Sequence, residues 1–198
     1  MSYSLMLASL CLAVLASATA AQEAEAPASG SDPVEGVEAT AFEERSKVGE
    51  VAATLALEAL KPELDAAGQP VLGEDGQPVL SFQPVADGMA LLPSDEFRYV
   101  VTVANAGSEV EAMELALDLP IEARLLPETV AASAEASFEL GSNADPASRK
   151  PLFVEIDGLS VPNPAWVAAP EAFDQLLVTI ERIASGETAT VTYHLVVR

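Results

Sequence analysis

Three long segments of this chain alternate apolar with polar or small residues, a pattern that predicts β-strands. In residues 97–103, every second side chain from Phe97 to Val103 is large and apolar. Residues 113–119 and 188–197 alternate in the same way. Because successive side chains of a strand point to opposite faces, each segment has one face suited to a core. The first two segments, joined by a short polar turn, are expected to form two antiparallel strands with a half-buried face.

Shorter apolar runs predict further strands, and turn residues separate them. We expect strands from residue 54 to about residue 61 and at residues 138–140, 152–156 and 173–180. The stretch around Trp166, which contains three prolines within ten residues, is expected to be irregular. Since no segment keeps a helical period for long, the pattern predicts an all-β, antiparallel β-sandwich over residues 54–198.

Residues 1–20 have the pattern of a secretory signal peptide. The apolar run at residues 5–16 is long enough for the central region of such a peptide and too short to span a bilayer. Small residues at positions 18–20 suit cleavage by a signal peptidase. Cys11 is the only cysteine and lies in this run, so the mature chain would form no disulfide. We therefore expect a periplasmic or secreted protein with no membrane span after cleavage.

Residues 21–53 are interpreted as an acidic spacer rich in Ala, Glu and Pro. The spacer is expected to be disordered because it holds too few large apolar residues to offset the entropy of ordering it. Residues 41–53 fit either a loop or a short helix. The net charge of −22 disfavours nucleic acid and anionic membranes and favours a soluble monomer. It also leaves open the recruitment of cations or of a basic partner.

Three motifs of the sandwich segment resemble a known bacterial family. They are the stretch at residues 92–108, Leu-Pro-Ser-Asp-Glu-Phe-Arg-Tyr-Val-Val-Thr-Val-Ala-Asn-Ala-Gly-Ser; Leu-Asp-Leu-Pro at residues 117–120; and Ala-Ser-Gly-Glu at residues 184–187, followed by an alternating Thr/Val strand. Their order is similar to that of the immunoglobulin-like repeat often labelled domain of unknown function eleven. Ser94 stands where this family usually has Gly, and Ala104 where Thr is common. The resemblance, which covers residues 54–198, implies an immunoglobulin-like sandwich of exported proteins with no enzymatic activity and no defined ligand.

Groups that catalysis commonly uses are scarce in the sequence. His194 is the only histidine, and its position on the polar face of the last predicted strand indicates an ordinary surface residue. A serine nucleophile needs a neighbouring base, and a zinc site built from Cys and His needs several such ligands. No glycine-rich phosphate-binding loop is present either.

Two weaker site hypotheses remain. The unit Gly-Gln-Pro-Val-Leu occurs at residues 68–72 and again at 76–80, which predicts turns flanking short extended pieces. Asp65, Glu74 and Asp75 lie in this segment and are candidate calcium ligands, because calcium prefers carboxylate oxygens; the alternative is a solvated polar loop. Trp166 is either an exposed contact residue for a partner or a plug at one end of the sandwich.

Together these patterns predict a non-enzymatic, exported structural or protein-interaction module of the bacterial cell envelope. We expect no cofactor, and the expected partner is another envelope protein. The alternative function is a calcium-dependent binding or adhesion domain.

Overall fold

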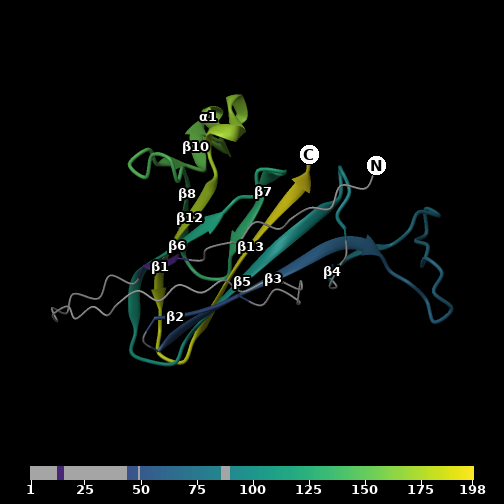
Figure 1. Ribbon diagram of the computed structural model, residues 1–198, viewed down its shortest axis with the longest axis horizontal. Coiled ribbons are helices and arrows are strands. Elements are labelled where there is room, and N and C mark those ends of the chain that lie inside the picture. The colour runs from purple at the N-terminus through teal and green to yellow at the C-terminus, as the bar shows by residue number, and fades with distance from the viewer. Residues whose placement is uncertain (1–12, 16–43, 49, 86–89) are drawn as a thin grey trace, which may run out of the picture.

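The computed structural model describes residues 13–15, 44–48, 50–85 and 90–198, and within them the chain is built from antiparallel strands (Figure 1). The strands are β1 (Ala13–Leu15), β2 (Glu44–Val48), β3 (Val51–Pro62), β4 (Leu80–Pro84), β5 (Glu96–Asn105), β6 (Val110–Asp118), β7 (Ala123–Ala132), β8 (Ala136–Gly141), β9 (Lys150–Pro151), β10 (Phe153–Ile156), β11 (Leu159–Pro162), β12 (Gln175–Ile183) and β13 (Thr188–Val197). Two short helices, α1 (Pro164–Ala168) and the 3-10 helix η1 (Pro170–Ala172), lie between β11 and β12.

The strands form two main sheets that share one core. The first sheet has the order β1-β6-β12-β8-β9, and the second has the order β2-β3-β5-β13-β7, with β4 also paired to β3. Strands β10 and β11 form a separate hairpin. Buried side chains of both sheets belong to one continuous apolar cluster. The predicted all-β sandwich is therefore confirmed.

The alternation seen in the sequence is the alternation of burial in the structure. In β5 the buried apolar side chains are Phe97, Tyr99, Val101 and Val103, and β13 and, from Met113 onward, β6 bury every second residue in the same way. Burying a large aliphatic side chain contributes about 1.5–3 kcal/mol each, so this aliphatic core is the main stabilising term of the fold.

Strands β5 and β6 do not pair with each other, contrary to the expectation from the sequence. They lie in different sheets, as do β12 and β13. In each case a short turn carries the chain from one sheet to the other. Alternation reports that one face is buried and does not report which strand lies alongside, so this error is inherent in the pattern.

The buried side chain of Asn105 ties the two crossing turns together. Its amide nitrogen donates to the carbonyl oxygens of Ser108 (2.7 Å) in the first turn and Ile183 (3.1 Å) before the second. The main chain adds two bonds across the same corner, from Gly186 N–H to the carbonyl of Asn105 and from Asn105 N–H to the carbonyl of Glu187. Two of the motifs that carry the family resemblance are thus in direct contact.

Several local predictions need correction. The short helix considered for residues 41–53 is not found, because residues 44–48 form β2 and pair with the start of β3. β7 escaped prediction because Pro127 and a mixture of Ala, Glu and Leu hide its alternation. The stretch around Trp166 is helical in part: Asn163 caps α1 and Pro164 stands at its first position, a common helix start.

Most of the predicted signal peptide and spacer lies outside the described residues. Residues 13–15 are described and form β1 beside β6. The end of the predicted spacer is described as well: residues 44–48 form β2 and β3 begins at Val51, so this part is ordered and the sheet begins before residue 54, contrary to the prediction. Neither short helix of the described segments has the length and apolar run that crossing a bilayer requires.

Candidate functional site

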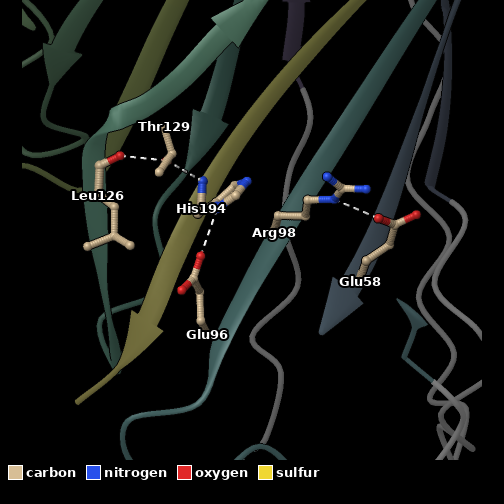
Figure 2. Close-up of polar contacts among 6 residues, drawn as sticks. All are labelled: Glu58, Glu96, Arg98, Leu126, Thr129 and His194. Atoms are coloured by element: carbon tan, nitrogen blue, oxygen red, sulfur yellow. Dashed lines mark hydrogen bonds and ion pairs between the residues drawn. The ribbon is translucent and has the colours of Figure 1, made fainter. Parts of the chain in front are cut away.

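A polar cluster lies on the outer face of the second sheet, where side chains of neighbouring strands stand directly opposite one another. Glu58 of β3 pairs in register with Arg98 of β5, and Arg98 pairs with His194 of β13. His194 in turn stands opposite Leu126 of β7. The sheet register therefore places residues from four strands in one row (Figure 2).

Arg98 is the centre of this row. Its Nε donates to Glu58 Oε2 at 2.7 Å. The guanidinium carbon lies 4.3 Å from the centre of the Phe82 ring, a cation–π distance. Because Phe82 belongs to β4, these contacts hold β4 against β3 and β5.

His194 is paired rather than free. Its Nδ1 lies 2.8 Å from Glu96 Oε1, and its ring meets the Phe82 ring edge-on at 4.7 Å between centroids. Only 18% of the His194 side chain is exposed. The sequence placed His194 on the polar face of the last strand, and the structure adds that its ring is half-buried against Phe82 and Glu96.

A threonine completes the cluster at an irregularity in β7. The register between β7 and β13 shifts between Thr192 and His194. There Thr129 Oγ1 accepts the backbone N–H of His194 at 2.9 Å and donates to the carbonyl of Leu126 at 2.6 Å (Figure 2). The hydroxyl thus replaces ladder bonds that the bulge has removed.

This arrangement has limited chemical scope. A histidine–carboxylate pair can activate a protein hydroxyl as a nucleophile only if that hydroxyl is free to give its proton to the ring. The nearby hydroxyl of Thr129 is committed to two backbone groups, and the charge of Arg98 is committed to Glu58. The contacts favour a structural role, namely fixing β4 onto the sheet.

A second ion pair fixes the same region. Lys61 Nζ lies 3.0 Å from Asp95 Oδ2, which also accepts the N–H of Leu92. Partial burial acts to raise the pKa of Asp95, but the bonds from Leu92 and Lys61 outweigh it and lower that pKa below its usual value.

Strands β3 and β4 anchor a projecting segment, residues 62–80, which we call the arm (Figure 1). The arm consists of an eight-residue unit that occurs twice, at residues 64–71 and 72–79. In the first unit Asp65 N–H donates to Gln69 O, and in the second Gly73 N–H donates to Gln77 O, both at 2.8 Å. Gly68 in the first unit and Gly76 in the second turn the chain, each with a φ of +76°.

The two units and the start of the arm close into a ring of backbone hydrogen bonds. Glu63 N–H donates to Val79 O, Val79 N–H to Val71 O, and Val71 N–H to Glu63 O, each at 2.8 Å. The three residues are spaced by eight in the sequence, so the repeat generates a pseudo-threefold arrangement. Each is followed by a leucine, and Leu64, Leu72 and Leu80 are 61%, 60% and 53% exposed.

The candidate calcium ligands lie in this arm. Asp65 Oδ1 accepts the N–H groups of Ala67 and Gln69, and Asp75 Oδ1 accepts that of Gln77. Both aspartates therefore cap turns of the repeat, and Glu74 is exposed. Across the described part of the chain, the structure gathers no group of three or more His, Cys, Asp or Glu side chains that could hold a metal ion.

Trp166 is only 5% exposed and belongs to the core. Its ring packs 6.2 Å from that of Phe173. This position corresponds to the plug and not to an exposed contact residue. Trp166 also lines a groove of about 250 Å³ between α1 and the irregular part of β7, together with Leu126, Pro127 and Pro170.

No family model, curated protein or solved structure matches this chain. The sequence motifs alone therefore carry the family resemblance.

The Glu58–Arg98–His194 row was not predicted from the sequence. A signal was available, since all three fall on the polar faces of predicted strands, but their register could not be read from it.

Proposed function

We propose that this chain is a non-enzymatic protein-interaction module of the bacterial cell envelope, a divergent immunoglobulin-like sandwich that presents the arm to a partner. The observation that carries the proposal is the arm itself. No residue from Glu63 to Leu80 is buried, although the repeat places an apolar leucine in each unit.

The anchoring of the arm supports this role. The strand pairs of β3 with β4, the Arg98–Phe82–Glu58 contacts and the Lys61–Asp95 pair all stand at its base. A segment held in this way loses little conformational entropy on binding, which favours recognition. The signal-peptide pattern at residues 1–20 supports export, and the resemblance of residues 54–198 supports a non-enzymatic domain of the envelope.

The geometry gives the calcium-dependent alternative no comparable support. The carboxylate oxygens of Asp65 and Asp75 already accept backbone N–H groups, as a turn cap does. We therefore do not advance that alternative as a second function.

In-cell photo-crosslinking tests the proposal. The full chain, tagged at its C-terminus, carries a photoreactive amino acid in place of Gln69, an exposed residue of the arm. The matched control carries it in place of Ala147, an exposed residue outside the arm. After irradiation in the bacterium that encodes the protein, we expect chain recovered from the periplasm or medium to be linked to an envelope protein from position 69 and not from position 147.

Two outcomes would contradict the proposal. Recovery of the chain from the cytoplasm would refute export. Adducts absent at position 69, or equally abundant at position 147, would refute the arm as the contact element.

A further inference from the structure

We infer that the partner of the arm is a basic protein surface with an apolar pocket, into which Leu64, Leu72 and Leu80 insert. This inference rests on the proposed function and specifies its partner. It is argued from the three exposed leucines of the arm, from the charge of the arm, and from a comparison of its two eight-residue units.

The comparison between the units separates residues that build the arm from residues that do not. Gly, Gln, Pro and Val recur at equivalent positions, and the Gly and Val positions have clear structural roles. Gly68 and Gly76 adopt a positive φ, while Val71 and Val79 are half-buried and close the backbone ring. In contrast, residues 65–67 and 73–75 differ between the units.

Leucine recurs without such a structural role. Leu64 and Leu72 are each about 60% exposed, so packing within the chain leaves most of their surface in water. A smaller or polar residue would close the same ring, because the ring uses backbone groups of the neighbouring position. Three exposed leucines at equivalent positions therefore fit contact with another molecule better than they fit folding.

The charge of the arm determines which molecule is favoured. All ionisable side chains from residue 62 to residue 80 are acidic, namely Glu63, Asp65, Glu74 and Asp75. Like charges facing each other cost free energy, so a second copy of the arm and an anionic lipid surface are disfavoured. A surface with Lys or Arg around an apolar pocket complements both the charges and the leucines.

A defined peptide tests the inference with the purified full chain. The probe is a twelve-residue peptide of alternating Lys and Leu, compared with peptides of alternating Lys and Ser and of alternating Glu and Leu. We expect the Lys–Leu peptide to bind best and its affinity to fall with added salt. Binding by the Lys–Ser peptide with equal affinity would show that charge alone is recognised and would overturn the inference.

Paired variants locate the binding. The arm variant is Leu64→Ser with Leu72→Ser and Leu80→Ser. The control variant is Leu92→Ser with Ile121→Ser and Leu159→Ser, three apolar side chains outside the arm that are 62–80% exposed. Losing three apolar contacts should weaken peptide binding at least about tenfold in the arm variant, whereas the control should change less than about twofold. Equal loss in both variants would overturn the inference.

Folding and alternative occupants are checked on the same samples. If the arm variant has an altered melting temperature, the single variant Leu72→Ser replaces it, with a smaller expected loss in the same direction. Dimerisation of the unmodified chain that the arm variant abolishes would identify a second copy as the occupant and overturn the inference. Binding to uncharged phosphatidylcholine vesicles that the arm variant abolishes would do the same for a lipid surface.

The peptide and crosslinking experiments fail independently. Crosslinks from position 69 without peptide binding would refute only the chemistry of the partner. Peptide binding without crosslinks in the cell would refute the proposed function and leave the arm as an acidic, apolar surface of the isolated chain.

Discussion

The substitution Tyr193→Phe tests whether the core contains a buried hydroxyl that has no hydrogen-bond partner. Tyr193 is fully buried in β13, and its hydroxyl has no hydrogen-bond partner among the described residues. Its ring packs against Tyr99 of β5, with 5.3 Å between centroids. Burial, followed by the nearby Tyr99 and Asp118, raises the pKa of Tyr193 well above its ordinary value, so the hydroxyl stays neutral at any ordinary pH.

The expected effect follows from the cost of an unpaired polar group. A buried hydroxyl without a partner costs about 1–3 kcal/mol relative to one in water. Phenylalanine removes this cost and leaves a void no larger than one oxygen atom, which takes back part of the gain. We expect Tyr193→Phe to raise the free energy of unfolding by about 1 kcal/mol. For a chain of this size, that corresponds to a melting temperature about 2–4 °C higher.

Urea unfolding and thermal melting of the full chain measure this change. Tyr99→Phe is the matched control, because Tyr99 lies on the neighbouring strand and keeps 4% of its surface exposed. We expect the control to change stability by less than about 0.5 kcal/mol. If Tyr193→Phe instead lowers stability by about 1 kcal/mol, the hydroxyl is hydrogen-bonded in the folded protein and the reasoning is refuted.

Three further predictions follow from the corner, the tyrosines and the arm. Asn105→Ala should cost about 2–3 kcal/mol in urea unfolding, because it removes the side-chain hydrogen bonds to the carbonyls of Ser108 and Ile183 where the two crossing turns meet. Stability should fall by about 2 kcal/mol from Tyr99 alone as the pH rises from 10 to about 12, because burial raises the pKa of Tyr99 to about 12 and the unfolded chain ionises first. Tyr193, whose pKa is also raised by burial, adds to this loss. Millimolar calcium should leave the melting temperature unchanged, because Asp65 and Asp75 cap turns and the described residues gather no metal-binding cluster.

Each of these measurements has a control and a contrary result. Asn143→Ala, at an exposed asparagine, should lower the free energy of unfolding by less than about 0.5 kcal/mol. If Asn105→Ala lowers it by no more than this control does, the role of Asn105 in joining the two crossing turns is refuted. Tyr99→Phe should reduce the alkaline loss of stability without abolishing it, because Tyr193 still contributes, and an unchanged pH profile would assign the whole loss to other groups. A calcium-dependent rise in melting temperature that Asp65→Asn abolishes would support the calcium-binding domain instead.

Many of the strands could be predicted because apolar residues at every second position indicate a strand with one buried face. Residues 97–103 and 188–197 lie within β5 and β13, residues 113–118 lie within β6, and the large apolar side chains at the alternate positions are buried. β7 was missed because its bulge and Pro127 interrupt that alternation. Helix α1 was not predicted, although Asn163-Pro164 is a common helix start. The three prolines within ten residues had indicated an irregular segment instead.

The contacts of the candidate site were harder to predict from the sequence than the strands. His194 could be placed on a polar face, but its contact with Glu96 joins residues 98 positions apart. Its contact with Phe82 depends on β4 pairing with β3, which no local pattern reports. The repeat of the arm was visible as Gly-Gln-Pro-Val-Leu, whereas its closed ring of hydrogen bonds and its exposed leucines were not.

The sequence by itself determined that this is an acidic, β-rich chain with an aliphatic core and a repeated turn unit, because composition, alternation and turn residues are local properties. Only the tertiary structure decided that β5 and β6 belong to different sheets, that Asn105 joins the two crossing turns, and that the leucines of the arm face water. Strand pairing is a relation between residues far apart in the chain. Its free energy depends on contacts that form only when the whole sandwich has closed.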